Sequence, residues 1–190
     1  MSTPTADYGV SGILRLTLLT HGMTNAMSAG RFPTDEPLNA LGIRQVRALG
    51  DLGSTDRVVA GPETRTRQTA ELRGWQPDLD PALADLDCGT WHGRTLTDVD
   101  PVALHQWMAD PASAPHGGES ITALIDRTAD WLHAASTTPG RLVAVTHPAV
   151  IRAAILTVLD APPESFWRID IPPASPTTLH HRKHWTLHPN

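Results

Sequence analysis

Three short apolar runs, each ending at a turn signal, constrain the fold of this 190-residue chain more than any other feature. The runs cover residues 13–20, 57–60 and 141–146 and are rich in Leu, Val, Ile or Thr. Short aliphatic runs of this kind are typical of strands buried inside a sheet, and stretches with helical periodicity separate them here. The pattern predicts a three-layer α/β/α sandwich with a mostly parallel central sheet.

Helices are expected where apolar positions recur every three or four residues, and turn residues mark most of their ends. The expected helices are 39–52, 63–73, 101–109, 120–135 and 148–159. Further strands are expected near 81–86, near 166–171 and in a hairpin over 176–187, and a long loop is expected over 25–37. The length favours one domain over residues 1–190, with an excursion at about 91–118 that forms a small cap.

Composition excludes several classes of partner and site. The formal net charge is −5 and Lys and Arg do not cluster, so neither nucleic acid nor an anionic membrane is an expected partner. Cys88 is the only cysteine, which rules out an intramolecular disulfide and argues against a cysteine-based zinc site. No stretch has the pattern of a signal peptide or the length of a membrane span. We therefore expect a cytoplasmic protein, as a monomer or a homodimer.

Two of the predicted strands end at a histidine, and the third leads into a helix that carries an arginine in its first turn. These residues are His21, His147 and Arg65. Because the carboxyl ends of parallel strands meet at one edge of a sheet, the three side chains are expected to line one pocket. Imidazoles, a guanidinium and helix N-termini together favour a phosphate site. A neutral imidazole can attack phosphorus there, and a carboxylic acid such as Asp85 can protonate the leaving alkoxide.

Five segments, in the same order, resemble the motifs of the histidine phosphatase superfamily, which has the phosphoglycerate mutase-like fold. Residues 18–24 resemble its Arg-His-Gly-Glu-Thr signature, and residues 61–70 its Ser-Pro-Leu-x-Arg-Ala-x-Gln-Thr-Ala segment. Residues 85–93, 117–120 and 145–152 resemble its Glu-x-x-x-Gly-x-Trp-x-Gly, Gly-Gly-Glu-Ser and Ser-His-Gly-Gly-Val-Ile-Arg segments. The resemblance covers almost the whole chain, and five motifs in order are far more specific than any one alone.

The resemblance implies a phosphatase that acts on a small phosphorylated metabolite through a phosphohistidine, without a cofactor or a metal. It gives His21 as the nucleophile, His147 as its catalytic partner and Asp85 as the proton donor, with Glu119 as the rival donor. Phosphate contacts are expected from Thr20, Thr24 and Arg65, and substrate contacts on the cap side from Trp91, His116 and Glu119.

The chain departs from the family pattern at three positions. Thr20 stands where the family has arginine, Met27 where it has asparagine, and Asp85 where it has glutamate. Charged hydrogen bonds of the kind lost at Thr20 are worth roughly 1.5–3 kcal/mol each. We therefore expect an active but atypical enzyme, in which Arg31 on the following loop is a candidate replacement for the missing guanidinium.

Three other interpretations remain open. Thr20 and Met27 also permit a catalytically weak member that binds an anionic or phosphorylated metabolite. The fold permits a mutase, although the chain is short for one. The histidines near the C-terminus suggest a metal site, but strand alternation sends the first two to opposite faces of their strand. Those histidines are His180, His181, His184 and His188.

Overall fold

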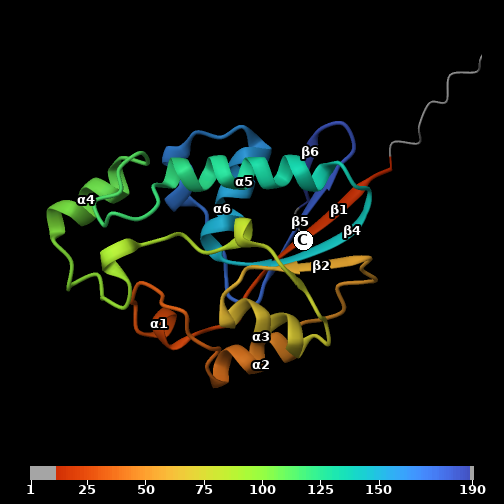
Figure 1. Cartoon of the computed structure of the whole chain (residues 1–190), viewed down its shortest axis with the longest axis horizontal. Helices are drawn as coiled ribbons and strands as arrows, with labels where there is room; N and C mark the ends of the chain where they lie inside the picture. The colour runs from red at the N-terminus through yellow and green to blue at the C-terminus, as the bar shows by residue number, and fades with distance from the viewer. Residues whose placement is uncertain (1–11, 189–190) are drawn as a thin grey trace, which may run out of the picture.

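A six-stranded sheet with the order β3-β2-β4-β1-β5-β6 forms the centre of the computed structural model, which describes residues 12–188 (Figure 1). Four strands are parallel: β1 (Leu14–Thr20), β2 (Arg57–Ala60), β3 (Asp78–Leu79) and β4 (Gly140–Thr146). A hairpin of β5 (Pro176–His181) and β6 (Trp185–His188) adds two antiparallel strands beside β1. The predicted mostly parallel sheet is therefore confirmed.

Helices cover both faces of the sheet (Figure 1). One layer holds α2 (Ala40–Ala48) and α3 (Thr64–Leu72), and the other holds α5 (Ile121–Ser136) and α6 (Pro148–Leu159). The short α1 (Asn25–Ser28) and α4 (Pro101–Ala109) lie beyond one end of the sheet, where the excursion 91–118 also lies. None of the helices within residues 12–188 combines the length and hydropathy that a membrane span requires.

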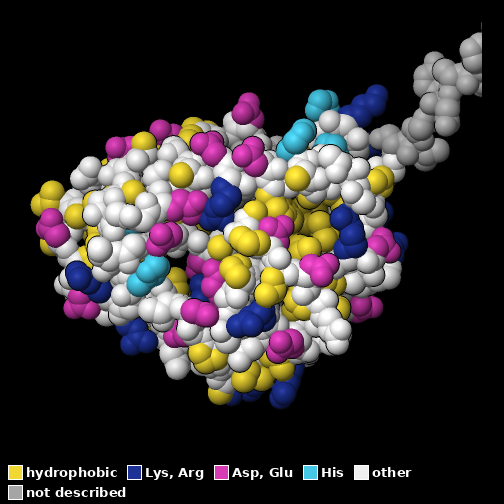
Figure 2. Space-filling model, in the orientation of Figure 1, with side chains coloured by type: hydrophobic (Ala, Val, Ile, Leu, Met, Phe, Trp, Pro, Cys, Tyr) yellow, Lys and Arg dark blue, Asp and Glu magenta, His cyan; other side chains and the backbone are white. Residues whose placement is uncertain are grey.

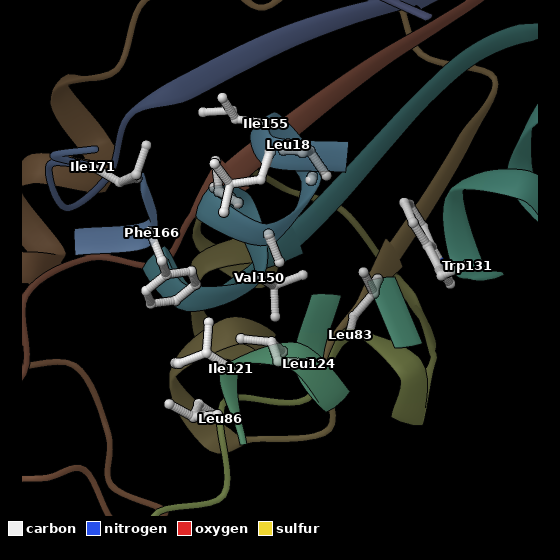
Figure 3. Packing of buried hydrophobic residues seen from close by; sticks show 14 of the residues in the cluster. Leu18, Leu83, Leu86, Ile121, Leu124, Trp131, Val150, Ile155, Phe166 and Ile171 are labelled. Carbon is white, nitrogen blue, oxygen red and sulfur yellow. The ribbon is translucent and has the colours of Figure 1, made fainter. Parts of the chain in front are cut away.

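One cluster of buried apolar residues lies between the sheet, α5 and α6, and smaller clusters lie on the side of α2 and α3. Leu18 from β1, Leu124 from α5 and Val150 from α6 point toward one another there (Figure 3). Phe166 and Leu86 belong to the same cluster, and all five side chains are almost completely buried (Figure 3). The cluster continues through Trp91 and Trp107 into the excursion. The core therefore holds α6 rigidly against the strands whose ends carry the predicted site.

Three segments differ from the sequence-based expectation. The strand expected over 166–171 is wrong: a 3-10 helix, η3 (Pro163–Arg168), begins there at Pro163, since proline suits the first helical position. Residues 81–86 likewise begin with a 3-10 turn, η1 (Pro81–Leu83), because the Asp80 carboxylate caps the Ala82 N–H. The expected loop 25–37 opens with α1, which the Thr24 hydroxyl caps.

The core makes a direct prediction about stability. Leu124→Ala removes a side chain that is 0% exposed, so it should lower the free energy of unfolding by about 2–5 kcal/mol. Leu159→Ala is the matched control, because Leu159 is also helical but 55% exposed, and it should cost less than about 0.5 kcal/mol. Urea unfolding of the two variants measures both values. Equal losses would contradict this assignment of the core.

Candidate active site

The register of two parallel strands brings the two histidines together. Thr20 of β1 pairs with Thr146 of β4, so the next residue in each strand leaves the sheet at the same edge. The His21 N–H donates to the Thr146 carbonyl over 3.1 Å, and the His21 and His147 ring centroids are 5.1 Å apart. Arg65 reaches the same edge from the first turn of α3, which follows β2. The structure thus brings these three predicted residues into one site.

His21 is a neutral, oriented imidazole. Its side chain is only 2% exposed, and its Nδ1 lies 2.8 Å from the Gly22 carbonyl oxygen. A carbonyl can only accept, so Nδ1 carries the proton and Nε2 keeps its lone pair. Burial, followed by the charges of His147 and Arg65, lowers the pKa of His21 to about 3. The ring therefore stays unprotonated, as a nucleophile requires, throughout the neutral range.

His147 is held by a carboxylate that the sequence analysis did not single out. Its Nε2 donates to Glu63 Oε2 over 2.8 Å, and Glu63 Oε1 accepts the Asp85 N–H over 2.9 Å. Burial alone would raise the pKa of Glu63, but the hydrogen bond and charge of His147 outweigh burial and lower it. Glu63 is therefore an ionised carboxylate that fixes the orientation of the His147 ring.

Gly61 makes room for this contact. A Cβ atom at Gly61 would lie 2.9 Å from Glu63 Oε2 and 3.1 Å from His147 Nε2. The family motif has serine and leucine where this chain has Gly61 and Glu63. The same Cβ atom would lie 2.7 Å from the Leu83 carbonyl oxygen, which is backbone and cannot easily move, so Gly61 lets three groups of the site approach one another closely.

Asp85 lies between Arg65 and His147. Arg65 Nη2 donates to Asp85 Oδ2 over 2.7 Å, and the same oxygen lies 3.3 Å from His147 Nδ1. Burial alone would raise the pKa of Asp85, but His147 and Arg65 outweigh burial and lower it to about 2. Asp85 is thus ionised, and its carboxylate sits where an anion bound by Arg65 and His147 would place an oxygen.

A pocket of about 190 Å³ opens in front of His21. Its walls are mainly apolar and aromatic, and three arginines and Asp85 supply the charge. His147 lies behind Asp85, fully buried, and does not itself line the pocket. The lining residues include Thr24, Arg31, Phe32, Arg65, Asp85, Trp107, Arg152, Phe166 and Trp167.

The two threonines of the first motif occupy different places. Thr24 lines the pocket, and its hydroxyl oxygen accepts the Met27 N–H, which leaves the hydroxyl hydrogen free to donate. The Thr20 hydroxyl lies instead 2.8 Å from the Pro172 carbonyl oxygen and accepts the Ser175 N–H. Thr20 ties the end of β1 to the segment that enters β5 and does not line the pocket, so we exclude it from the phosphate contacts.

The residues expected to contact substrate from the cap side do not line the pocket. Glu119 forms a two-bond ion pair with Arg127, over 2.9 and 2.8 Å, and the same arginine donates to the carbonyls of residues 82 and 84. Trp91 and His116 are buried against each other and against Trp107. Glu119 is therefore taken up by Arg127, the residue of α5 that bonds to η1 and the residue after it. Trp91 and His116 form the interior of the cap.

Several pocket and site residues were missed by the sequence analysis, and Glu63, Arg152 and Trp167 are examples. Glu63 had a visible signal, since a carboxylate replaces an apolar residue two positions before Arg65. Arg152 ends the fifth motif, although no role was given to it. Trp167 had no signal, because it falls in a segment expected to be a strand.

The histidines near the C-terminus gather at the edge of the molecule where β6 lies (Figure 2). The His180 and His188 ring centroids are 3.8 Å apart, and His181 packs against Trp185. Within residues 12–188, no three His, Cys, Asp or Glu side chains come together as a metal site would need.

Comparison with known proteins agrees with this geometry. The sequence model of the histidine phosphatase superfamily (branch 1) matches residues 16–188. A glucosyl-3-phosphoglycerate phosphatase from Mycolicibacterium vanbaalenii is 31% identical over 177 residues, which cover 81% of this chain and 78% of the relative.

Solved structures share the fold over nearly the whole chain. The mycobacterial glucosyl-3-phosphoglycerate phosphatase has a TM-score of 0.81 at 25% identity, covering 92% of this chain and 97% of its own. The phosphoserine phosphatase of Entamoeba histolytica, in complex with 3-phosphoglyceric acid, has a TM-score of 0.83 at 24% identity, covering 92% and 94%. The expectations of a phosphoglycerate mutase-like fold and of a phosphatase-type enzyme are confirmed, and the chain belongs to the histidine phosphatase superfamily.

Proposed function

We propose that this chain hydrolyses a small phosphate monoester through a phosphohistidine formed on His21. The observation that carries the proposal is the state of that ring: its Nδ1–H is held by the Gly22 carbonyl and its pKa is about 3, so Nε2 is an available nucleophile. The 31% identical relative is named for a phosphatase of a phosphorylated sugar acid, which supports this class of reaction.

In the first step His21 Nε2 forms a bond to phosphorus while the ester P–O bond breaks. Arg65 and His147 would stabilise the charge on the phosphoryl oxygens, with one further hydrogen bond from the Thr24 hydroxyl. Asp85 would deliver a proton to the departing alcohol oxygen. Water then attacks the phosphohistidine, Asp85 takes up the proton, and the broken P–N bond returns the lone pair to His21.

Asp85 must change its protonation state to play this role. In the free enzyme its pKa of about 2 keeps it ionised, because it pairs with Arg65 and lies beside His147. A phosphoryl group needs the same two partners, so it would displace the carboxylate and place negative charge beside it. Both changes favour the protonated carboxyl group. The arriving substrate would thus convert Asp85 from a counterion into an acid.

A second candidate is a family member that binds a phosphorylated ligand without turning it over. The position of Thr20 favours this second candidate. Its hydroxyl is already hydrogen-bonded to the segment before β5, so Arg65 is the arginine left to bind a phosphate beside His21. Binding of a phosphate ester by the parent protein, with no turnover on any ester tested, would favour this candidate.

His21→Ala should lower turnover of the best phosphate ester by roughly 10³-fold or more, since it removes the nucleophile. His133→Ala is the control, because it removes an exposed histidine of α5 outside the pocket. The parent should give an acid-labile phosphoenzyme when quenched during turnover, and His21→Ala should give none. Equal phosphoenzyme in both proteins would contradict the proposal.

Asp85→Asn should affect two measurements in opposite directions. Turnover of alkyl phosphates should fall by about 10²-fold, and turnover of nitrophenyl phosphate should fall far less, because nitrophenolate leaves without a proton. Inorganic phosphate should inhibit the variant about tenfold more strongly, since it no longer displaces a carboxylate. Asp78→Asn, on the exposed edge strand β3, should change neither. Weaker inhibition by phosphate would argue against Asp85 as a competing anion.

Glu63→Leu restores the residue type of the family motif and should lower kcat by about 10- to 100-fold, since His147 loses its charged hydrogen bond. Glu63→Gln keeps one oxygen acceptor for two donors and should lose less. KM should change little in both variants, because Glu63 does not line the pocket. Steady-state kinetics gives both constants, and an unchanged kcat in Glu63→Leu would show that the contact does not position His147.

A further inference from the structure

A row of three basic residues crosses neighbouring strands at the end of the sheet opposite to His21. Arg15 of β1 is in register with Arg141 of β4 on one side and with His180 of β5 on the other. Residues in register project from the same face, and neighbouring strands are about 4.8 Å apart, so the row is about 10 Å long. The three positions are far apart in the sequence, and only the folded chain brings them together.

The row lies on the part of this face that α2 and α3 leave open. Toward the other end of the same strands, Leu19 and Val145 project from the same face and are buried in the cluster that includes Ala70 of α3. Arg15 and Arg141 are exposed instead. A cavity of about 290 Å³ opens over the row, and hydroxyl-bearing residues form part of its wall: Thr17, Ser54 and Thr178.

The protein supplies no counter-charge to the two arginines. No carboxylate of residues 12–188 forms a salt bridge with Arg15 or Arg141, and none of the described residues that line the cavity is Asp or Glu. Arg141 donates to the Ser54 hydroxyl, and the Asp56 carboxylate accepts the backbone N–H of Arg141. Like charges opposite each other destabilise a sheet, so the row costs stability in the free protein.

His180 responds to the charges around it. Burial, followed by the charges of His188 and Arg15, lowers the pKa of His180. The ring centroids of His180 and His188 are 3.8 Å apart, which places a fourth basic side chain beside the row. A bound anion would favour the protonated imidazole and relieve the repulsion between the two arginines. This arrangement gains from an anion in a way that scattered surface arginines do not.

We propose that this cavity is a second anion site, separate from the pocket of His21, whose ligand is a short phosphate chain such as a diphosphate group. A guanidinium offers paired N–H donors that match phosphate oxygens, and Thr17 and Ser54 add hydroxyls to the same wall. A row of this length provides contacts for two or three linked phosphates, whereas a single phosphate would leave one end of it unused. The inference goes beyond the phosphatase reaction and does not depend on it.

Calorimetric titration with pyrophosphate tests this site. The parent should bind pyrophosphate at millimolar concentrations or below, and Arg15→Gln and Arg141→Gln should each weaken the binding by about tenfold, since each loses a charged hydrogen bond. Arg168→Gln is the matched control, because it removes an exposed arginine that lines neither cavity, and it should bind as the parent does. If pyrophosphate also enters the pocket of His21, it gives a second class of sites, which both substitutions should leave unchanged.

A parallel titration with ADP distinguishes two sources of the phosphate chain. Tighter binding of ADP than of pyrophosphate would assign the ligand to nucleotides, and equal or weaker binding of ADP would assign it to the phosphate chain alone. The proposal is overturned if the parent binds neither compound, or if Arg15→Gln and Arg141→Gln bind pyrophosphate as tightly as the control does.

Thermal unfolding separates binding from folding. Without an anion, Arg15→Gln should have a Tm equal to or above that of the parent, because one of two adjacent like charges is removed. Pyrophosphate should raise the Tm of the parent more than that of the variant. A variant Tm below that of the parent without an anion would show that Arg15 already has a stabilising partner in the protein, and it would contradict the unbalanced charge on which the proposal rests.

Discussion

The pairing of β1 with β4 is the constraint on which the site depends. Thr20 and Thr146 are partners in a parallel ladder, so His21 and His147 emerge together. A slip of one residue would send one imidazole to the opposite face of the sheet. The turn after His21 is equally restricted, because a Cβ atom on Gly22 would lie 2.7 Å from the carbonyl oxygen of Gly42 in α2. The backbone alone, through the register of β1 with β4 and the close approach of Gly22 to α2, thus sets the positions from which His21 and His147 leave the sheet.

Charge is distributed unevenly around these rings. Each of the two hydrogen-bond donors at the proposed phosphate end has its own carboxylate partner: Asp85 accepts from Arg65, and Glu63 accepts from His147. Such neutral pairs tolerate burial, but they also compete with an incoming phosphate for the same donors. A substrate that gains affinity elsewhere in the pocket would overcome this competition more readily than inorganic phosphate does. If the site binds phosphate as proposed, the loss of the family arginine and the gain of Glu63 would act in the same direction, since both would weaken the binding of inorganic phosphate.

The sequence could predict the elements with strong local signals. Three of the four parallel strands, β1, β2 and β4, followed from short apolar runs, and the Ser120 cap of α5 and the convergence of His21 with Arg65 followed from caps and motif order. The strand expected near 81–86 was misplaced, because β3 lies at Asp78–Leu79. The direction of individual side chains was not predictable, because it depends on partners far away in the chain. Thr20 bonds to residues more than 150 positions later, and Arg127, the partner of Glu119, also bonds to carbonyls more than 40 positions earlier. The burial of Trp91 and His116 was not predictable for the same reason, because both pack against Trp107, which comes from another part of the excursion.

The burial that keeps His21 neutral also links the fold to acidity. Its pKa is about 3 in the folded chain against 6.5 for an ordinary histidine, so the unfolded chain binds a proton more readily between these values. Folding stability therefore decreases as the pH falls from about 6.5 toward 3. Asp85, with its pKa lowered from 3.8 to about 2, removes a further contribution as the pH falls through that lower range. The buried, neutral His21 imidazole thus makes the folded protein more sensitive to acid than it would be with an exposed histidine at this position.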